Sequence, residues 1–126
     1  MAKAFICLHH NREKLQDYVC SLLQNWKVKV YASMDDVFDH LWESGDDVDL
    51  IISEPANSFQ EELFNAAEHW PNLLFVAVFD EVDRPIKCPD NVVLLRSQDV
   101  QKEILSRIDH WGKRHSFLHL NHNSTN

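Results

Sequence analysis

Glycine is scarce in this chain of 126 residues, since only Gly45 and Gly112 are present. Loops that bind phosphate through backbone amides usually need several glycines, because side chains would keep the phosphate at a distance. The sequence accordingly contains neither a G-x-G-x-x-G nor a P-loop motif. Cys7 and Arg12 follow an apolar run without a glycine between them, so we expect Cys7 in the core and not as a phosphatase nucleophile.

Cysteines and long apolar runs are also few. The three cysteines, Cys7, Cys20 and Cys88, fit no zinc or redox motif, and their odd number predicts reduced thiols. No stretch of about 18 apolar residues is present, which argues against a membrane-spanning helix. The apolar run at the start of the chain is too short for a signal peptide. From these absences we expect a cytoplasmic protein.

Positive charge is in short supply as well. The 12 Lys and Arg residues stand against 20 Asp and Glu, which gives a formal net charge of −8. Nucleic-acid binding draws most of its affinity from cations that contact phosphates, so we expect no direct nucleic-acid partner. Hydrophobic residues make up 44% of the chain, enough for a folded domain with its own core.

What the sequence does contain is an alternation of two kinds of segment. Short runs rich in Val, Ile and Phe predict buried strands, at residues 4–8, 28–32, 48–53, 73–79 and 92–95. Apolar residues at three- and four-residue spacing predict helices, at residues 12–26, 34–45, 59–70 and 100–111. The expected N-terminal caps of these helices are Asn11, Ser33, Ser58 and Asp99. Gly112 is expected to end the last helix.

Strands that alternate with helices predict a parallel sheet with helices on both faces. Right-handed crossovers favour the strand order 2-1-3-4-5, which gives a five-stranded, flavodoxin-like α/β fold of three layers. Residues 80–90 contain two prolines and no helical period, so we expect a loop to shorten or replace the fourth helix. The predicted organisation is one domain at residues 1–112 and a polar, flexible tail at residues 113–126.

In a sheet of this kind, functional groups gather at the carboxyl ends of the strands. His9 and His10 follow the first predicted strand, and Glu54 follows the third. Phe79 ends the fourth strand and Arg96 ends the fifth. These five residues form the candidate site.

The layout resembles the receiver domains of response regulators, the CheY-like family, over about residues 3–112. Residues 48–55 are similar to the family's third strand and place Glu54 where the phosphoacceptor aspartate would stand. The acidic Mg²⁺ pair, the Ser or Thr and the Lys of the family correspond here to His9–His10, Phe79 and Arg96. The resemblance implies the receiver fold, while each of these positions departs from the family's pattern.

These departures predict a degenerate receiver, or pseudo-receiver, that does not take up phosphate. Two histidines do not replace two carboxylates as ligands of Mg²⁺, and the extra methylene of Glu54 moves its oxygen from the in-line position. We therefore expect no enzymatic activity, no catalytic residue, no cofactor and no bound metal. Glu54 and Arg96 could form a permanent ion pair that imitates the activated state, or both could point into solvent.

A second candidate for metal binding lies in the tail. His115, His119 and His122 have spacings that would align on a helix and could hold zinc. The Asn and Ser residues between them oppose a helix, so a solvated tail is the better interpretation.

The preferred interpretation is a signalling or regulatory module that acts by contact with another protein, independently of phosphorylation. A homodimer is compatible with it, and a membrane partner is not expected. The binding region is expected around the loop, the last strand and the last helix, with the candidate residues Arg84, Pro85, Ile86, Val93 and Trp111. The tryptophans fall near predicted helix ends and are expected to seal the core, while one or two could anchor a partner.

Three other interpretations stay open. Residues 15–17 and 56–59 are faintly similar to the amino-terminal pseudo-receiver of the clock protein KaiA, which would imply an input domain. A small flavodoxin-like enzyme or ligand binder would have a pocket formed by His9, Glu54, Asp80 and Arg96. An acidic inhibitor or adaptor would present a patch of one charge to a basic partner.

Overall fold

The computed structural model describes residues 2–9, 11–44, 47–55, 60–80 and 87–115. Its strands are β1 (Lys3–Cys7), β2 (Lys27–Val30), β3 (Leu50–Ser53), β4 (Leu74–Phe79) and β5 (Val92–Arg96). Its helices are α1 (Glu13–Leu22), α2 (Met34–Ser44), α3 (Gln60–His69) and α4 (Val100–His115). In the described residues between β4 and β5 there is no helix, and residues 81–86 of the predicted loop lie outside the description.

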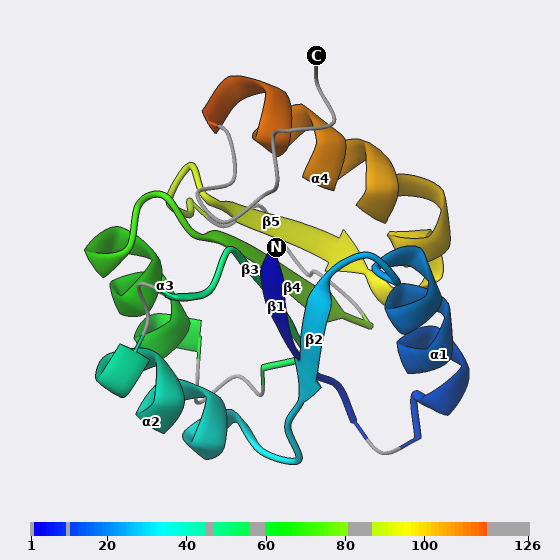
Figure 1. The fold of residues 1–126 in the computed structure, drawn as a ribbon, viewed down its shortest axis with the longest axis horizontal. Helices are drawn as coiled ribbons and strands as arrows, with labels where there is room; N and C mark the ends of the chain where they lie inside the picture. Colours follow the sequence, from blue (N-terminus) through cyan, green and yellow to red (C-terminus); the bar gives the residue numbers. More distant parts are fainter. Residues whose placement is uncertain (1, 10, 45–46, 56–59, 81–86, 116–126) are drawn as a thin grey trace.

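The five strands run parallel in one sheet with the order β2-β1-β3-β4-β5 (Figure 1). This confirms the predicted α/β fold class and strand order. Helices α1 and α4 pack on one face of the sheet, and α2 and α3 pack on the other. Strand β2 lies at an edge, where its exposed lysines discourage pairing with another chain.

The core consists of two apolar layers, one on each face of the sheet. Successive residues of a strand point to opposite faces, so Ile6 and Ile52 pack with the α1–α4 layer, whereas Phe5 and Ile51 pack with the α2–α3 layer. All four side chains are fully buried, and each burial contributes roughly 2 kcal/mol. Cover on both faces explains why the inner strands are almost entirely apolar.

The starts of the helices follow the predictions in part. Ser33 caps α2 as predicted, because its hydroxyl oxygen accepts a hydrogen bond from the backbone N–H of Asp36 (3.3 Å). Asn11 does not cap α1, since Arg12 takes the capping position and its side chain makes no cap. The guanidinium of Arg12 instead contacts Glu54 and Asp80, the residues that follow β3 and β4. Ser58, the predicted cap of α3, lies outside the described residues.

Helix α4 begins at Val100, where the sequence placed it, but it ends later than predicted. A short 3-10 helix at Ser97–Asp99 leads into it, so Asp99 belongs to this turn. The helix then passes through Gly112 and ends at His115, because the buried Trp111 keeps its last turns packed on the core. The boundary between a domain at residues 1–112 and a tail stays a prediction. In the described part of the chain no helix has the length and apolar character needed to cross a membrane.

A buried asparagine connects the start of β5 to the end of α3. The side-chain amide of Asn91 donates to the carbonyl oxygens of Ala67 (2.9 Å), Trp70 (3.0 Å) and Leu73 (2.8 Å). The last carbonyls of a helix have no partner within the helix, so they must find one elsewhere when they are buried. Asn91 supplies it from the loop before β5, and only 4% of its surface is exposed.

Candidate functional site

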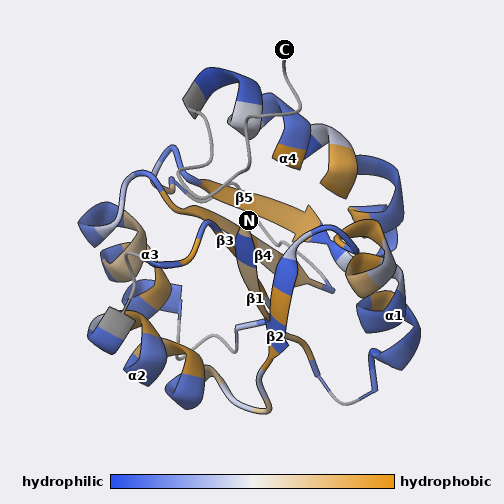
Figure 2. Ribbon diagram, in the orientation of Figure 1, coloured by the Kyte–Doolittle hydropathy of each residue, from blue (hydrophilic) through white to orange (hydrophobic). Residues whose placement is uncertain are grey.

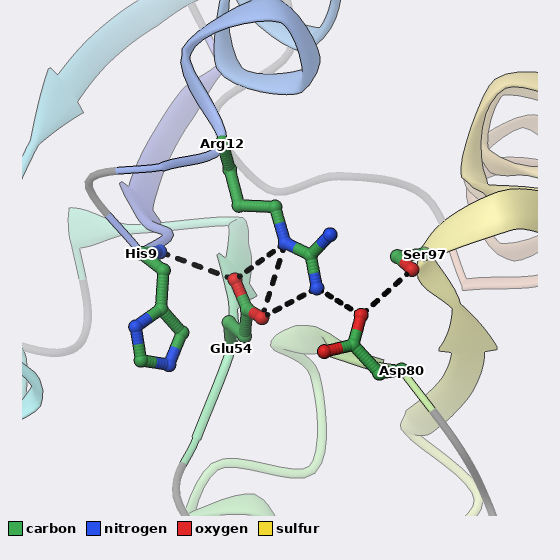
Figure 3. A network of polar contacts seen from close by, with 5 residues as sticks. All are labelled: His9, Arg12, Glu54, Asp80 and Ser97. Carbon is green, nitrogen blue, oxygen red and sulfur yellow. Dashed lines mark hydrogen bonds and ion pairs between the residues drawn. The ribbon is translucent and has the colours of Figure 1, made fainter.

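The carboxyl ends of the strands bring together residues that are distant in the sequence. His9 follows β1, Glu54 follows β3, Asp80 follows β4 and Ser97 follows β5. Arg12 lies just before α1, on the same side of the sheet (Figure 3). All five parallel strands end on the same side of the sheet, which is called the carboxyl edge below. The five residues form a continuous polar network there.

Arg12 and Glu54 form the centre of this network. The guanidinium Nε lies 3.3 Å and 3.2 Å from the two carboxylate oxygens, and Nη2 lies 3.0 Å from Oε2. The backbone N–H of His9 donates to Oε1 as well (3.1 Å). Only 8% of the Glu54 side chain is exposed, so both of its oxygens are held by donors of the protein in a largely desolvated position.

Asp80 extends the network toward β5. Its Oδ1 accepts hydrogen bonds from Nη2 of Arg12 and from the hydroxyl of Ser97 (3.0 Å). These two hydrogen bonds, and then the charges of Arg12 and His9, lower the pKa of Asp80. The bonds from Glu54 and Asp80 raise the pKa of Arg12 above its ordinary value. One fixed cation therefore bridges two carboxylates from neighbouring strands.

The backbone around Arg12 explains how its side chain is placed. Its N–H donates to the carbonyl oxygen of His9 (2.9 Å), which closes a tight turn after β1. Its carbonyl oxygen accepts the N–H of Gln16 (2.8 Å), the first hydrogen bond of α1. The Glu54 N–H donates to the Cys7 carbonyl oxygen (2.9 Å) and continues the β1–β3 ladder. Both partners of the ion pair are thus fixed by secondary structure on either side.

The structure places the five predicted site residues in different surroundings. Glu54 lies in the network, and His9 contributes its backbone N–H, while its exposed imidazole makes no contact there (Figure 3). Phe79 is half-buried against the α2–α3 layer. Arg96 is 54% exposed and pairs with Asp99 (3.4 Å). His10 lies outside the described residues.

The ion pair considered between Glu54 and Arg96 is not formed, and Glu54 does not point into solvent either. Glu54 lies next to Arg12, because the turn after β1 points that guanidinium toward the residues that follow β3 and β4. Arg96 instead bonds locally to Asp99 in the turn that follows β5. The sequence contained one usable signal for Arg12: it is a cation placed after a predicted strand end, where such a charge reaches neighbouring strand ends.

The predicted partner-binding residues also separate. Arg84, Pro85 and Ile86 lie outside the described residues. Val93 is half-buried against the α1–α4 layer, and Trp111 is 6% exposed, too buried to serve as a protruding anchor. Both border a hollow of about 470 Å³ between β5 and the end of α4.

The hollows at the carboxyl edge do not form the predicted ligand pocket. A cavity of about 220 Å³ is lined by His9 and Glu54 together with residues that begin α2, but neither Asp80 nor Arg96 borders it. A wider hollow of about 560 Å³ lies between the start of α1 and the start of α4. Within the described ranges, no three His, Cys, Asp or Glu side chains are grouped so that they could hold a metal ion. None of the three hollows is bordered by His9, Glu54, Asp80 and Arg96 together, and of these four residues only Arg96 lies outside the polar network.

Comparisons with known proteins bear on the fold. No protein-family model and no curated protein sequence matches this chain. A response regulator receiver domain protein from Bacillus halodurans C-125 is similar in structure, with a TM-score of 0.65, 16% identity and coverage of 87% of this chain and 96% of that one. A fragment described as a lipoprotein from Peptoclostridium difficile 630 is also similar in structure, with a TM-score of 0.60 and 18% identity. The alignment covers 87% of this chain and 97% of that fragment. The chain has a receiver-like fold, and at these identities the likeness extends to the fold alone.

The contact between Arg12 and Asp80 gives a testable pH dependence. We expect the Asp80 carboxyl to titrate below its ordinary value of 3.8, measured by carbon-13 NMR of the side chain. Because the pKa is lower in the folded chain, the contact stabilises the fold above the ordinary value and loses this effect as the pH falls through the lowered pKa. Arg12→Leu should return the titration toward its ordinary value, whereas Arg96→Leu should not change it. An Asp80 titration that is the same in both variants and the unaltered chain would contradict the assignment.

Proposed function

We propose that the chain is a signalling or regulatory module that acts by contact with another protein and does not use phosphotransfer. The observation that carries this proposal is the bridge from Arg12 to Glu54 and Asp80. The receiver-like fold supports the choice of a signalling module. The sequence resemblance implies that the phosphoacceptor position of receiver domains corresponds to Glu54. The location in the cytoplasm, a homodimer and the likeness to clock input domains stay predictions.

The chemistry of phosphotransfer explains why this bridge matters. A carboxylate that accepts phosphate must attack in line, while a divalent cation with oxygen ligands neutralises the charge of the incoming group. Here both oxygens of Glu54 already accept hydrogen bonds from Arg12, and the same guanidinium holds Asp80. A metal ion and a phosphoryl donor would have to displace a charge-assisted, largely desolvated pair before any reaction.

The bridge also gives the carboxyl edge a permanent charge state. In a phosphorylated receiver, a negative group at this edge is gained and lost, and its surroundings move with it. In this chain the negative groups and their cation belong to the protein, so the edge holds one arrangement. A module of this kind signals by being present and binding, rather than by being switched at this site.

Phosphate analogues test the proposal directly. We expect no change in the backbone amide spectrum on addition of beryllofluoride with Mg²⁺, and no added phosphoryl mass after incubation with acetyl phosphate. A receiver that is competent for phosphorylation, treated in parallel, verifies the reagents. Saturable shifts at Glu54, Asp80 and Ser97 would contradict the proposal, and their loss in Glu54→Gln would assign the binding to this site.

A further inference from the structure

The two helices on one face of the sheet are acidic and contain no cation. Helix α2 has the sequence MDDVFDHLWES and α3 has QEELFNAAEH, so neither includes a Lys or Arg. The carboxylates of α2, all exposed, are Asp35, Asp36, Asp39 and Glu43. Those of α3, also exposed, are Glu61, Glu62 and Glu68. Within the described residues, the ion pairs of the molecule involve none of these side chains.

These helices lie side by side, and their outer surfaces are hydrophilic (Figures 1 and 2). The opposite side of the sheet is different, because α4 carries the cations Lys102, Arg107, Lys113 and Arg114. It has fewer carboxylates than cations, namely Glu103 and Asp109. The negative charge of the chain is therefore concentrated on the outer surface of α2 and α3, which gives that side a field of one sign.

The field of this acidic surface reaches the groups beneath it. Burial raises the pKa of Tyr31, and the nearby charge of Asp36 raises it further. Burial likewise raises the pKa of the Cys7 thiol, with additional effects from Asp36 and then Glu54. Two lysines of the neighbouring strands lie over aromatic rings, with Lys3 Nζ 5.8 Å from the centre of the Phe5 ring and Lys29 Nζ 5.0 Å from that of Tyr31. They do not pair with the helix carboxylates.

An aromatic cluster lies within the same surface. The centre of the Trp42 ring, in α2, lies 4.9 Å from that of His69, the last residue of α3. It lies 4.7 Å from the centre of the Trp70 ring, and Trp70 directly follows α3. The rings of His69 and Trp70 are 4.4 Å apart. Mutual packing restricts their motion, yet 54% of Trp42 remains exposed. An exposed tryptophan held in one orientation provides contact area at a small entropic cost.

We infer that the outer surface of α2 and α3 is a docking surface for a basic segment of a partner protein. An Arg or Lys side chain of the partner lies over the exposed ring of Trp42, and neighbouring cations face carboxylates such as Asp39 and Glu43. The inference rests on the proposed function, and it adds the surface and the chemistry of the partner. Charge complementarity selects a basic segment, because seven carboxylates without a cation attract positive charge and repel nucleic acid and anionic lipid. The exposed ring of Trp42, near the ends of both helices, adds a cation–π contact.

A designed peptide provides the test. The probe is a labelled helical peptide with Arg and Leu among alanines, and its control has Glu in place of Arg. We expect the Arg peptide to shift amide signals of α2 and α3 and the indole N–H signals of Trp42 and Trp70. The indole signals of Trp26 and Trp111 should stay in place, and the Glu peptide should cause no shift.

Matched variants then locate the binding energy. Asp39→Lys with Glu43→Lys should weaken binding by at least about tenfold. Asp17→Lys with Asp109→Lys changes the net charge equally on the other side of the sheet and should weaken it far less, since those residues are exposed there. Trp42→Leu keeps an apolar side chain and should weaken binding about threefold through the lost cation–π contact. Unfolding midpoints of all variants verify that they are folded.

The outcomes separate this inference from the function on which it rests. Shifts outside α2 and α3, equal weakening by both charge-reversal pairs, or no binding would overturn the docking surface and leave the proposed function standing. Self-association of the unaltered chain that is abolished only by the α2 pair would assign the surface to a second copy and also overturn the inference. Beryllofluoride binding would contradict the proposed function without changing the peptide result.

Discussion

Replacing Asn91 with alanine is expected to lower the free energy of unfolding by about 3 kcal/mol. The reason is that one side-chain amide serves the carbonyl oxygens of Ala67, Trp70 and Leu73, and alanine leaves them without this donor in a place that water reaches poorly. An unsatisfied buried acceptor costs about 1–3 kcal/mol, and three acceptors share the loss here. Urea unfolding followed by tryptophan fluorescence and circular dichroism measures the effect.

The control for this prediction is Asn65→Ala, which replaces an exposed asparagine of α3. It should change the unfolding free energy by no more than about 0.5 kcal/mol. Asn91 lies where β5 begins, at the opposite edge of the sheet from the Arg12 network, so amide signals of Glu54 and Asp80 should stay unchanged in Asn91→Ala. A loss below about 0.5 kcal/mol in Asn91→Ala would show that the three carbonyls find other donors.

Replacing Arg12 with leucine is expected to cost about 2 kcal/mol of unfolding free energy. The substitution leaves the Glu54 carboxylate 8% exposed and without its cation, and it removes the donor shared with Asp80. Full burial would make the cost higher, but 21% of the Arg12 side chain is exposed and solvent screens part of the charge. The same urea experiment measures the loss.

A double-mutant cycle isolates the pair from the packing of its side chains. Arg12→Leu and Glu54→Leu together should lose less stability than the sum of the single losses, with a coupling of about 2 kcal/mol. Arg96→Leu removes an exposed pair with Asp99 and should stay within about 0.5 kcal/mol of the unaltered chain. A coupling near zero between Arg12 and Glu54 would show that the bridge contributes nothing to stability.

The fold could be predicted from the sequence, unlike the contacts of Asn91 and Arg12. Ile6, Ile51, Ile52 and Phe75 lie in runs that are mainly apolar, and such runs predict strands covered on both faces. The order of strands and helices then leaves few topologies, and the structure has the favoured one. Local periodicity is sufficient for this, because it reflects burial along each element.

The candidate site could be predicted in position but not in its contacts. The position of Glu54 at the end of the third strand follows from the sequence, whereas the cation considered beside it was Arg96 and the structure has Arg12. Arg12 and Glu54 are 42 positions apart, and their contact depends on the turn after β1. Two arginines near one carboxylate satisfy any sequence rule equally, so only the path of the backbone selects between them.

By itself the sequence determined the succession of elements, the two-sided cover of a parallel sheet and which residues follow the strands. Hydrophobic periodicity and the end of each run encode these features within a few residues. Only the tertiary structure decided that Arg12 pairs with Glu54 and that Asn91 donates to the carbonyl oxygen of Ala67 in α3. It also decided that the two acidic helices lie side by side with the rings of Trp42 and Trp70 in contact. The physical reason is that hydrogen bonds and ring contacts require distances of a few ångströms between groups that only the assembled layers bring together.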